Sequence, residues 1–167
     1  MGLDWLVEKK PCDNHKEQFY KLKYKLSILN KIDEPSEETN KQIEELEKEF
    51  KGISITPEDT LGELNKEDIN KLYEVFNSGS FLTSNYDFRG KIIGEAEILN
   101  EELKEEAFEN HNAEQCIQYA CKLECFLESL NKTDDDDIDE DEYNDIIKGI
   151  KWLKFWGNKG HGYCSWY

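Results

Sequence analysis

Apolar side chains recur along most of the chain at the three- and four-residue spacing that lines one face of an α-helix. The spacing predicts helices that begin near Asn14, Ser36, Pro57 and Asn65, and later helices over 95–109, 113–130 and 141–156. The first residues differ, because apolar and polar side chains alternate there as in a half-buried strand: Leu3, Trp5 and Val7. The pattern indicates a mainly helical fold.

Several helix boundaries carry recognisable local signals. Ser36 is a good N-cap, and Thr56 precedes a proline and two acids, a strong helix start. Asn14 has Glu17 three residues later, the spacing of a capping box, and Asn65 can cap the next helix. The stretch 80–94 is the least helical, and we expect an ordered loop there with a short strand over 91–93.

The segment 113–130 is apolar on more than one side, which is typical of a central helix. We therefore expect a mainly α fold in which residues 1–167 form a single compact domain of six or seven helices. Trp5 is a natural packing partner for the aromatic C-terminal segment, so the irregular termini should pack together.

Charge and composition narrow the function classes. The 167 residues carry a net charge of -17, which repels phosphate backbones and argues against direct nucleic-acid binding. No apolar run approaches membrane-spanning length, so we expect no membrane association. Five cysteines, an odd number without a leader segment, favour reduced thiols in the cytoplasm.

The C-terminal part combines an acidic hinge over 134–142 with an aromatic, glycine-rich tail over 157–167. Lysines accompany the aromatic side chains from Tyr143 onward, although the chain as a whole is strongly acidic. Such a segment either packs on the fold or contacts a partner. The residues expected to provide this packing or contact are Trp152, Trp156, Trp166 and Tyr167.

Two cysteine–histidine pairs lie near opposite ends of the chain. Cys12 and His15 are separated by two residues, and so are His161 and Cys164. Two thiolates and two imidazoles complete a tetrahedral zinc site, which would also join the termini. The alternative is that these are ordinary thiols and hydrogen-bonded histidines, so zinc is a hypothesis here.

The acidic hinge can also be aligned with a calcium-binding EF-hand loop that starts at Asn131. Its candidate ligands are Asp135, Asp137, Asp139 and Glu142. Asp136 stands where the loop needs glycine, and Thr133 replaces an expected acid. A solvated acidic hinge, or an acidic clamp for basic proteins, explains the same run.

No catalytic motif is recognisable, and there is no phosphate-binding glycine loop. Cys116, Cys121 and Cys125 fall on the predicted central helix, where small apolar packing is the ordinary role of cysteine. His111 is the nearest base, but its surroundings are acidic, which argues against a cysteine hydrolase. We therefore expect no enzyme activity and no cofactor, with zinc and calcium as the metal alternatives.

Three short patches carry a family resemblance: Met1–Trp5 (MGLDW) followed by Lys10 and Pro11, Thr56–Gly62 (TPEDTLG), and Phe155–Gly162 (FWGNKGHG). Together they resemble a group of small uncharacterised proteins of large nucleocytoplasmic DNA viruses and some of their algal or protist hosts. The resemblance implies a viral origin and a non-catalytic role in the particle or in host interaction, within the host cytoplasm or the virion. It supplies no functional residues.

These observations favour a structural or protein-interaction component that self-associates through an aromatic surface, for example as a homodimer. The alternatives are a metal-binding module that uses one of the two candidate sites, and an acidic clamp for basic proteins.

Overall fold

The computed structural model describes residues 2–76, 86–131 and 138–167. The chain divides into two units: unit 1 contains Met1–Glu8 and Pro57–Tyr167, and unit 2 contains Lys9–Thr56. Eight helices and four short strands lie within the described residues, so the fold is mainly α, as predicted. The described part contains one helix more than the six or seven expected, and the single domain over 1–167 stays a prediction.

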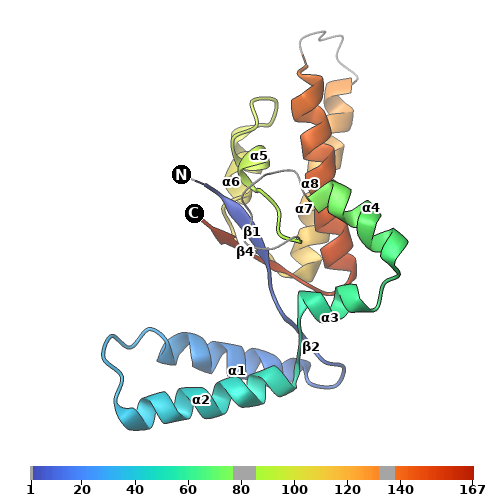
Figure 1. Ribbon diagram of the computed structural model, residues 1–167. Coiled ribbons are helices and arrows are strands. Elements are labelled where there is room, and N and C mark those ends of the chain that lie inside the picture. Colours follow the sequence, from blue (N-terminus) through green and yellow to red (C-terminus); the bar gives the residue numbers. More distant parts are fainter. Residues whose placement is uncertain (1, 77–85, 132–137) are drawn as a thin grey trace. The chain divides into compact units, whose positions relative to one another are not determined.

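Unit 2 is a helical hairpin. Its helices α1 (Lys16–Leu29) and α2 (Glu37–Gly52) lie side by side (Figure 1), and the short strands β2 (Lys10–Pro11) and β3 (Ser54–Ile55) pair antiparallel at its base. The rings of Phe19 and Phe50 lie 4.7 Å apart at the centre of a small core. The other members of this core are Leu22, Leu46 and Ile53.

The start of α2 is as predicted, because Ser36 Oγ accepts a hydrogen bond from the backbone N–H of Thr39. The predicted start of α1 is wrong. Asn14 adopts a left-handed backbone conformation (φ 71°), so the helix begins only at Lys16, after His15, which makes no side-chain cap.

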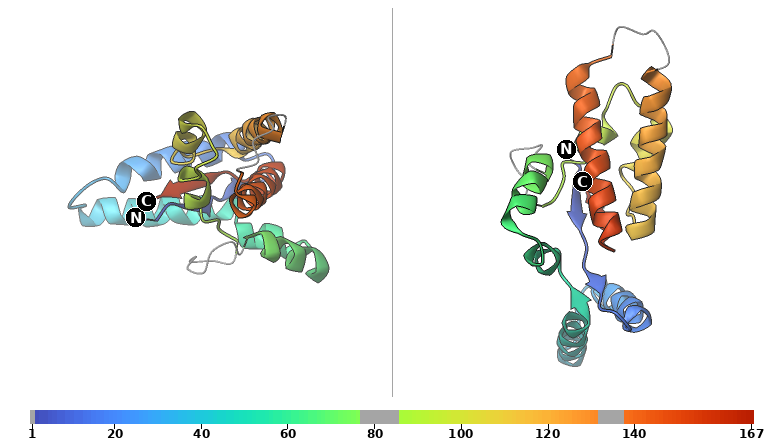
Figure 2. Two further views of the ribbon diagram at one scale, coloured as in Figure 1. Left: turned by 90° about the horizontal axis from the view of Figure 1, so that it is seen from above. Right: turned by 90° about the vertical axis from the view of Figure 1, so that its right-hand side faces the viewer.

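Unit 1 is built around two long helices, α7 (Ala113–Asn131) and α8 (Glu140–Asn158), which run side by side in Figures 1 and 2. The prediction of a central helix over 113–130 is confirmed, since α7 buries five side chains: Cys116, Tyr119, Ala120, Leu123 and Leu127. The shorter helices of this unit are α3 (Pro57–Gly62), α4 (Lys66–Phe76), α5 (Lys91–Gly94) and α6 (Glu101–Glu106).

The two terminal segments of unit 1 pair as antiparallel strands, β1 (Asp4–Val7) and β4 (Tyr163–Trp166), with Trp5 opposite Ser165. Single β-bridges extend this pair on both sides, from Trp5 to Phe88 and from His111 to Tyr163. The strand predicted at Leu3–Val7 is thus confirmed in outline, and the termini do pack together. The irregular C-terminal tail is corrected: its last residues form a strand, reached by a turn in which Gly160 has φ 85°.

Two predictions for the middle of the chain are wrong. Residues 91–93 belong to the helix α5, and the long helix expected over 95–109 is reduced to α6. Asn100 caps α6 by accepting from Leu103 N–H. Before it, the carboxylate of Glu142 accepts the backbone N–H groups of residues 97 and 98 at 2.7 and 3.2 Å and holds a turn.

Among the described residues, none of the helices has the length and apolar character needed to cross a membrane.

Candidate functional site

Trp5 lies at the centre of an aromatic cluster in unit 1. Its ring stacks on Tyr163 at 4.8 Å and contacts Phe88 at 5.4 Å and Trp152 at 5.6 Å. The indole N–H of this fully buried side chain donates to the carbonyl oxygen of Ala107 at 2.8 Å. Strand β1, strand β4, helix α8 and the segment after α6 are therefore tied to one another through one side chain.

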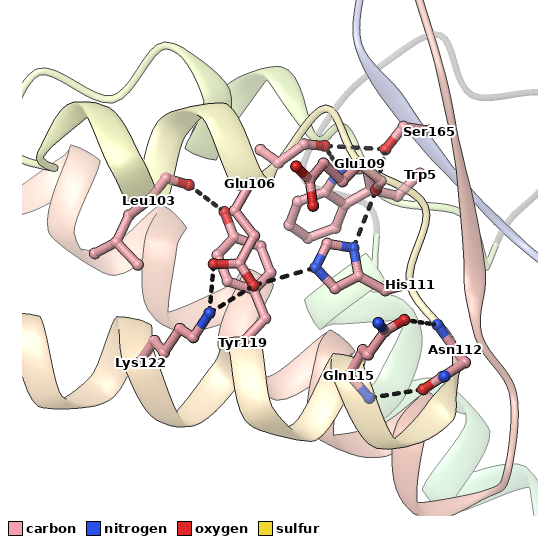
Figure 3. Close-up of polar contacts among 11 residues, drawn as sticks. Trp5, Leu103, Glu106, Glu109, His111, Asn112, Gln115, Tyr119, Lys122 and Ser165 are labelled. Atoms are coloured by element: carbon pink, nitrogen blue, oxygen red, sulfur yellow. Dashed lines mark hydrogen bonds and ion pairs between the residues drawn. The ribbon is translucent and has the colours of Figure 1, made fainter.

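His111 joins this cluster as a buried polar residue (Figure 3). Its ring stacks on that of Tyr119 at 5.2 Å. It also stacks on the ring of Tyr163 at 4.9 Å. Nδ1 faces the carbonyl oxygen of Glu109 at 3.0 Å, and Nε2 faces the carboxylate of Glu106 at 3.3 Å. Both partners are acceptors, so both contacts are hydrogen bonds when the ring carries both protons.

Glu106, the acid that contacts His111, also forms an ion pair with Lys122. Lys122 on α7 donates to both carboxylate oxygens of Glu106, at 2.9 and 3.1 Å (Figure 3). The side chain of His111 is only 4% exposed and that of Glu106 16%, whereas that of Lys122 is 54% exposed. This group joins α6 and the segment after it to α7. Its geometry is that of a structural support.

Ser165 on β4 forms hydrogen bonds with the segment after α6, and we call this set of contacts the Ser165 clamp. The backbone N–H of Ser165 donates to Asn110 Oδ1 at 2.9 Å, and its hydroxyl lies 3.0 Å from the carbonyl oxygen of Ala107. This clamp holds residues 107–110 against β4. It places the ring of Phe108 edge-on against that of Tyr167, at 5.4 Å.

The aromatic side chains on this clamp are exposed. Trp166 and Tyr167 are 64% and 65% exposed, and Phe108 is 38% exposed. We call these three residues the aromatic patch: the rings of Phe108 and Tyr167 are in contact, and Trp166 precedes Tyr167 in the chain. Two exposed acids lie close to Phe108 in sequence, Glu105 three positions before it and Glu109 directly after it.

Helix α1 of unit 2 carries another exposed apolar surface, which the sequence analysis did not identify. Tyr20, Tyr24 and Ile28 follow one another at four-residue spacing and are 47%, 68% and 48% exposed. Ile32, just beyond the helix, is 45% exposed. We call these four residues the α1 face. The four-residue spacing of these residues is present in the sequence. The inward residues Phe19, Leu22 and Leu26 are already enough to predict an amphipathic helix, so the second apolar side was missed.

The four aromatic residues predicted for packing or contact divide between these two roles. Trp152 and Trp156 are fully buried in the core of unit 1, so they present no surface to a partner and act in packing. Trp166 and Tyr167 are exposed and remain candidates for contact.

The zinc hypothesis draws its ligands from both units: Cys12 and His15 belong to unit 2, and His161 and Cys164 to unit 1. The buried His161 already uses both ring nitrogens. Nδ1 donates to the carbonyl oxygen of Glu8 at 2.7 Å, and Nε2 forms a hydrogen bond with the Thr60 hydroxyl, also at 2.7 Å. A metal would have to displace one of these bonds.

Two of the four candidate calcium ligands, Asp135 and Asp137, lie outside the described residues, as does the first part of the acidic hinge, 134–137. The other two candidate ligands have structural roles. Asp139 caps α8 by accepting from two backbone N–H groups, and Glu142 holds the turn before α6. Within the described ranges, no three side chains of the metal-binding types gather closely enough to hold an ion. Both metal sites stay predictions.

The buried thiol of Cys116 on α7 is poorly suited to act as a nucleophile. Burial raises the pKa of Cys116 to about 12, and the nearby charge of Glu8 adds to this effect. A thiolate is therefore strongly disfavoured at neutral pH. Cys121 and Cys125, by contrast, are exposed on the same helix.

No family model matches the chain, and neither curated proteins nor solved structures gave a match.

Proposed function

We propose that this protein is a non-enzymatic interaction component that associates with itself through the aromatic patch of Phe108, Trp166 and Tyr167. The observation that carries the proposal is the combination of exposure and anchoring. These rings are open to solvent, yet the Ser165 clamp and the Trp5–Ala107 hydrogen bond hold the backbone beneath them.

Anchored aromatic side chains are efficient contact residues. A protein–protein contact gains most of its free energy from a few large side chains, with Trp and Tyr the most frequent among them. Ordering a loop on binding costs free energy, and a backbone that is already held avoids that cost. The patch has both properties, and its side chains are exposed. Trp152 and Trp156 are buried, so they offer no surface to a partner.

The experiment compares the parent with a variant in which Trp166→Thr and Tyr167→Ser are combined. Light scattering after gel filtration should find the parent larger than one chain and the variant shifted toward a single chain. A matched variant carries Glu45→Gln and Lys48→Gln at exposed positions of α2, which leaves the net charge unchanged, and it should behave as the parent. A parent that is a single chain at every concentration contradicts the proposal.

The uneven charge supports a second candidate, an acidic clamp for basic proteins. The ten lysines of residues 9–56 balance ten acids, so the net charge of -17 lies entirely in unit 1. Such a field attracts basic partners over about a Debye length. Binding of a lysine-rich polypeptide that disappears when 134–142 is neutralised supports this candidate, and unchanged binding excludes it.

The location is part of the same proposal. We place the protein in the cytoplasm, and the resemblance of its three sequence patches supports a virus particle or an infected host cell as the setting.

A further inference from the structure

The charge of unit 2 is balanced overall but divided between its helices. Residues 16–31, which contain α1, carry five lysines and one acid, Glu17. Residues 37–52, which form α2, carry six acids and three lysines. Within a strongly acidic chain, α1 is thus a basic helix.

The lysines of α1 border its outward apolar side. The helix turns Phe19, Leu22 and Leu26 inward, which leaves Tyr20 and Tyr24 on the opposite side. At 100° per residue, Lys16 and Lys23 fall on one border of the Tyr20–Tyr24–Ile28 row, and Lys21 and Lys25 fall on the other. A shallow apolar hollow lies at Tyr20 and Tyr24, the first two residues of this row. The lining residues are Lys16, Glu17, Tyr20, Lys21 and Tyr24.

This arrangement favours a partner that is apolar in the middle and acidic at its edges. The aromatic patch fits that description, because Phe108 has the exposed acids Glu105 and Glu109 close to it in sequence and belongs to the unit that holds the whole net negative charge. Contact between two α1 faces is disfavoured, since it would bring two sets of lysines together.

We propose that the α1 face of one molecule docks on the aromatic patch of a second copy of the same chain. The proposal rests on the proposed function and identifies the surface that receives the patch. The contact is heterologous, because two different surfaces meet. Each added molecule therefore leaves one α1 face and one patch free, and association continues until a ring closes or a chain grows.

Two surface variants test this pairing. The α1 variant combines Tyr20→Gln and Tyr24→Gln, which keeps good helix formers at exposed positions. The patch variant combines Trp166→Thr and Tyr167→Ser. Circular dichroism and urea unfolding establish that both are folded. Each variant by itself should associate at least about tenfold more weakly than the parent, because each loses two large aromatic contacts. The Glu45→Gln, Lys48→Gln variant serves as the matched control.

Mixing the two variants gives the decisive result. The α1 variant keeps an intact patch and the patch variant keeps an intact α1 face, so an equimolar mixture should form a one-to-one pair that grows no further. Native mass spectrometry with one variant isotope-labelled identifies such a pair.

The possible failures are distinguishable. An α1 variant that associates as the parent does, while the patch variant is a single chain, overturns this inference and leaves the proposed function standing. A parent that never associates overturns both. If both variants are single chains and their mixture forms no pair, the two surfaces do not bind each other, and the inference is wrong.

Discussion

The buried pair of Thr60 and His161 offers a sharp test of the structure. Thr60→Val preserves the shape of the side chain but removes the hydroxyl that forms a hydrogen bond with His161 Nε2 at 2.7 Å. His161 is fully buried and Thr60 is only 3% exposed, so water cannot easily replace the lost hydroxyl. Leaving a buried polar atom without its hydrogen-bond partner costs about 1–3 kcal/mol. Thr60→Ser keeps the hydroxyl and loses one methyl group, which costs about 1 kcal/mol.

The assay is urea unfolding of the parent and both variants, followed by circular dichroism. A loss of about 2 kcal/mol is a large share of the roughly 5–15 kcal/mol that stabilises a typical domain. With a urea dependence of about 2 kcal/mol per molar, the midpoint of Thr60→Val should fall by about 1 M. Thr60→Ser should fall by less. The reasoning is refuted if the valine variant unfolds at the parent's midpoint, or if the serine variant is the less stable of the two.

Three further predictions concern packing and ionisation. Gly162→Ala should lower the free energy of unfolding by about 1–3 kcal/mol, because its new Cβ would overlap the backbone carbonyl oxygen of His111. Gly52→Ala places its Cβ in open space and should be neutral or slightly stabilising. Equal urea midpoints of the two variants would contradict this. Raising the pH from 9 toward 12 should destabilise the fold, because the pKa of Cys116 in the folded protein, about 12, lies above the ordinary value of 9.0. The unfolded state therefore loses this proton first, and each pH unit lowers the free energy of unfolding by up to about 1.4 kcal/mol. A urea midpoint independent of pH over this range would refute the assignment. In thiol labelling of the native protein, Cys121 should react at neutral pH and Cys116 only after unfolding; early labelling of Cys116, mapped by mass spectrometry, would contradict its burial.

Local signals were sufficient to predict several elements. Ser36 and Asn65 mark helix starts by accepting hydrogen bonds from backbone N–H groups three residues later, and Pro57 marks one through its fixed backbone angle. In each case the cause is local in sequence. The length and apolar pattern of α7 likewise predicted a central helix. Such features depend little on what the rest of the chain does.

The remaining features depend on residues far apart in sequence. Strand β4 exists because it pairs with β1, and the short helix α6 follows a turn held by Glu142 on another helix. No local pattern in 163–166 or 95–109 reports those partners.

The candidate site shows the same division. The aromatic content of the C-terminal part was plain in the sequence, but which rings are exposed was not. Trp156 falls inward on α8, whereas Trp166 ends a strand and points to solvent. On α1, the row of Tyr20, Tyr24 and Ile28 could have been found by asking whether a second side of the helix was apolar.

The central claim is that this protein associates with itself through exposed aromatic and oppositely charged surfaces. Sedimentation velocity of the parent over a wide range of concentration, at low and at high salt, tests it most directly. The account predicts species that grow with concentration and become smaller at high salt, because the flanking charges are screened. A sedimentation coefficient that stays at the value of one chain under all of these conditions would contradict it.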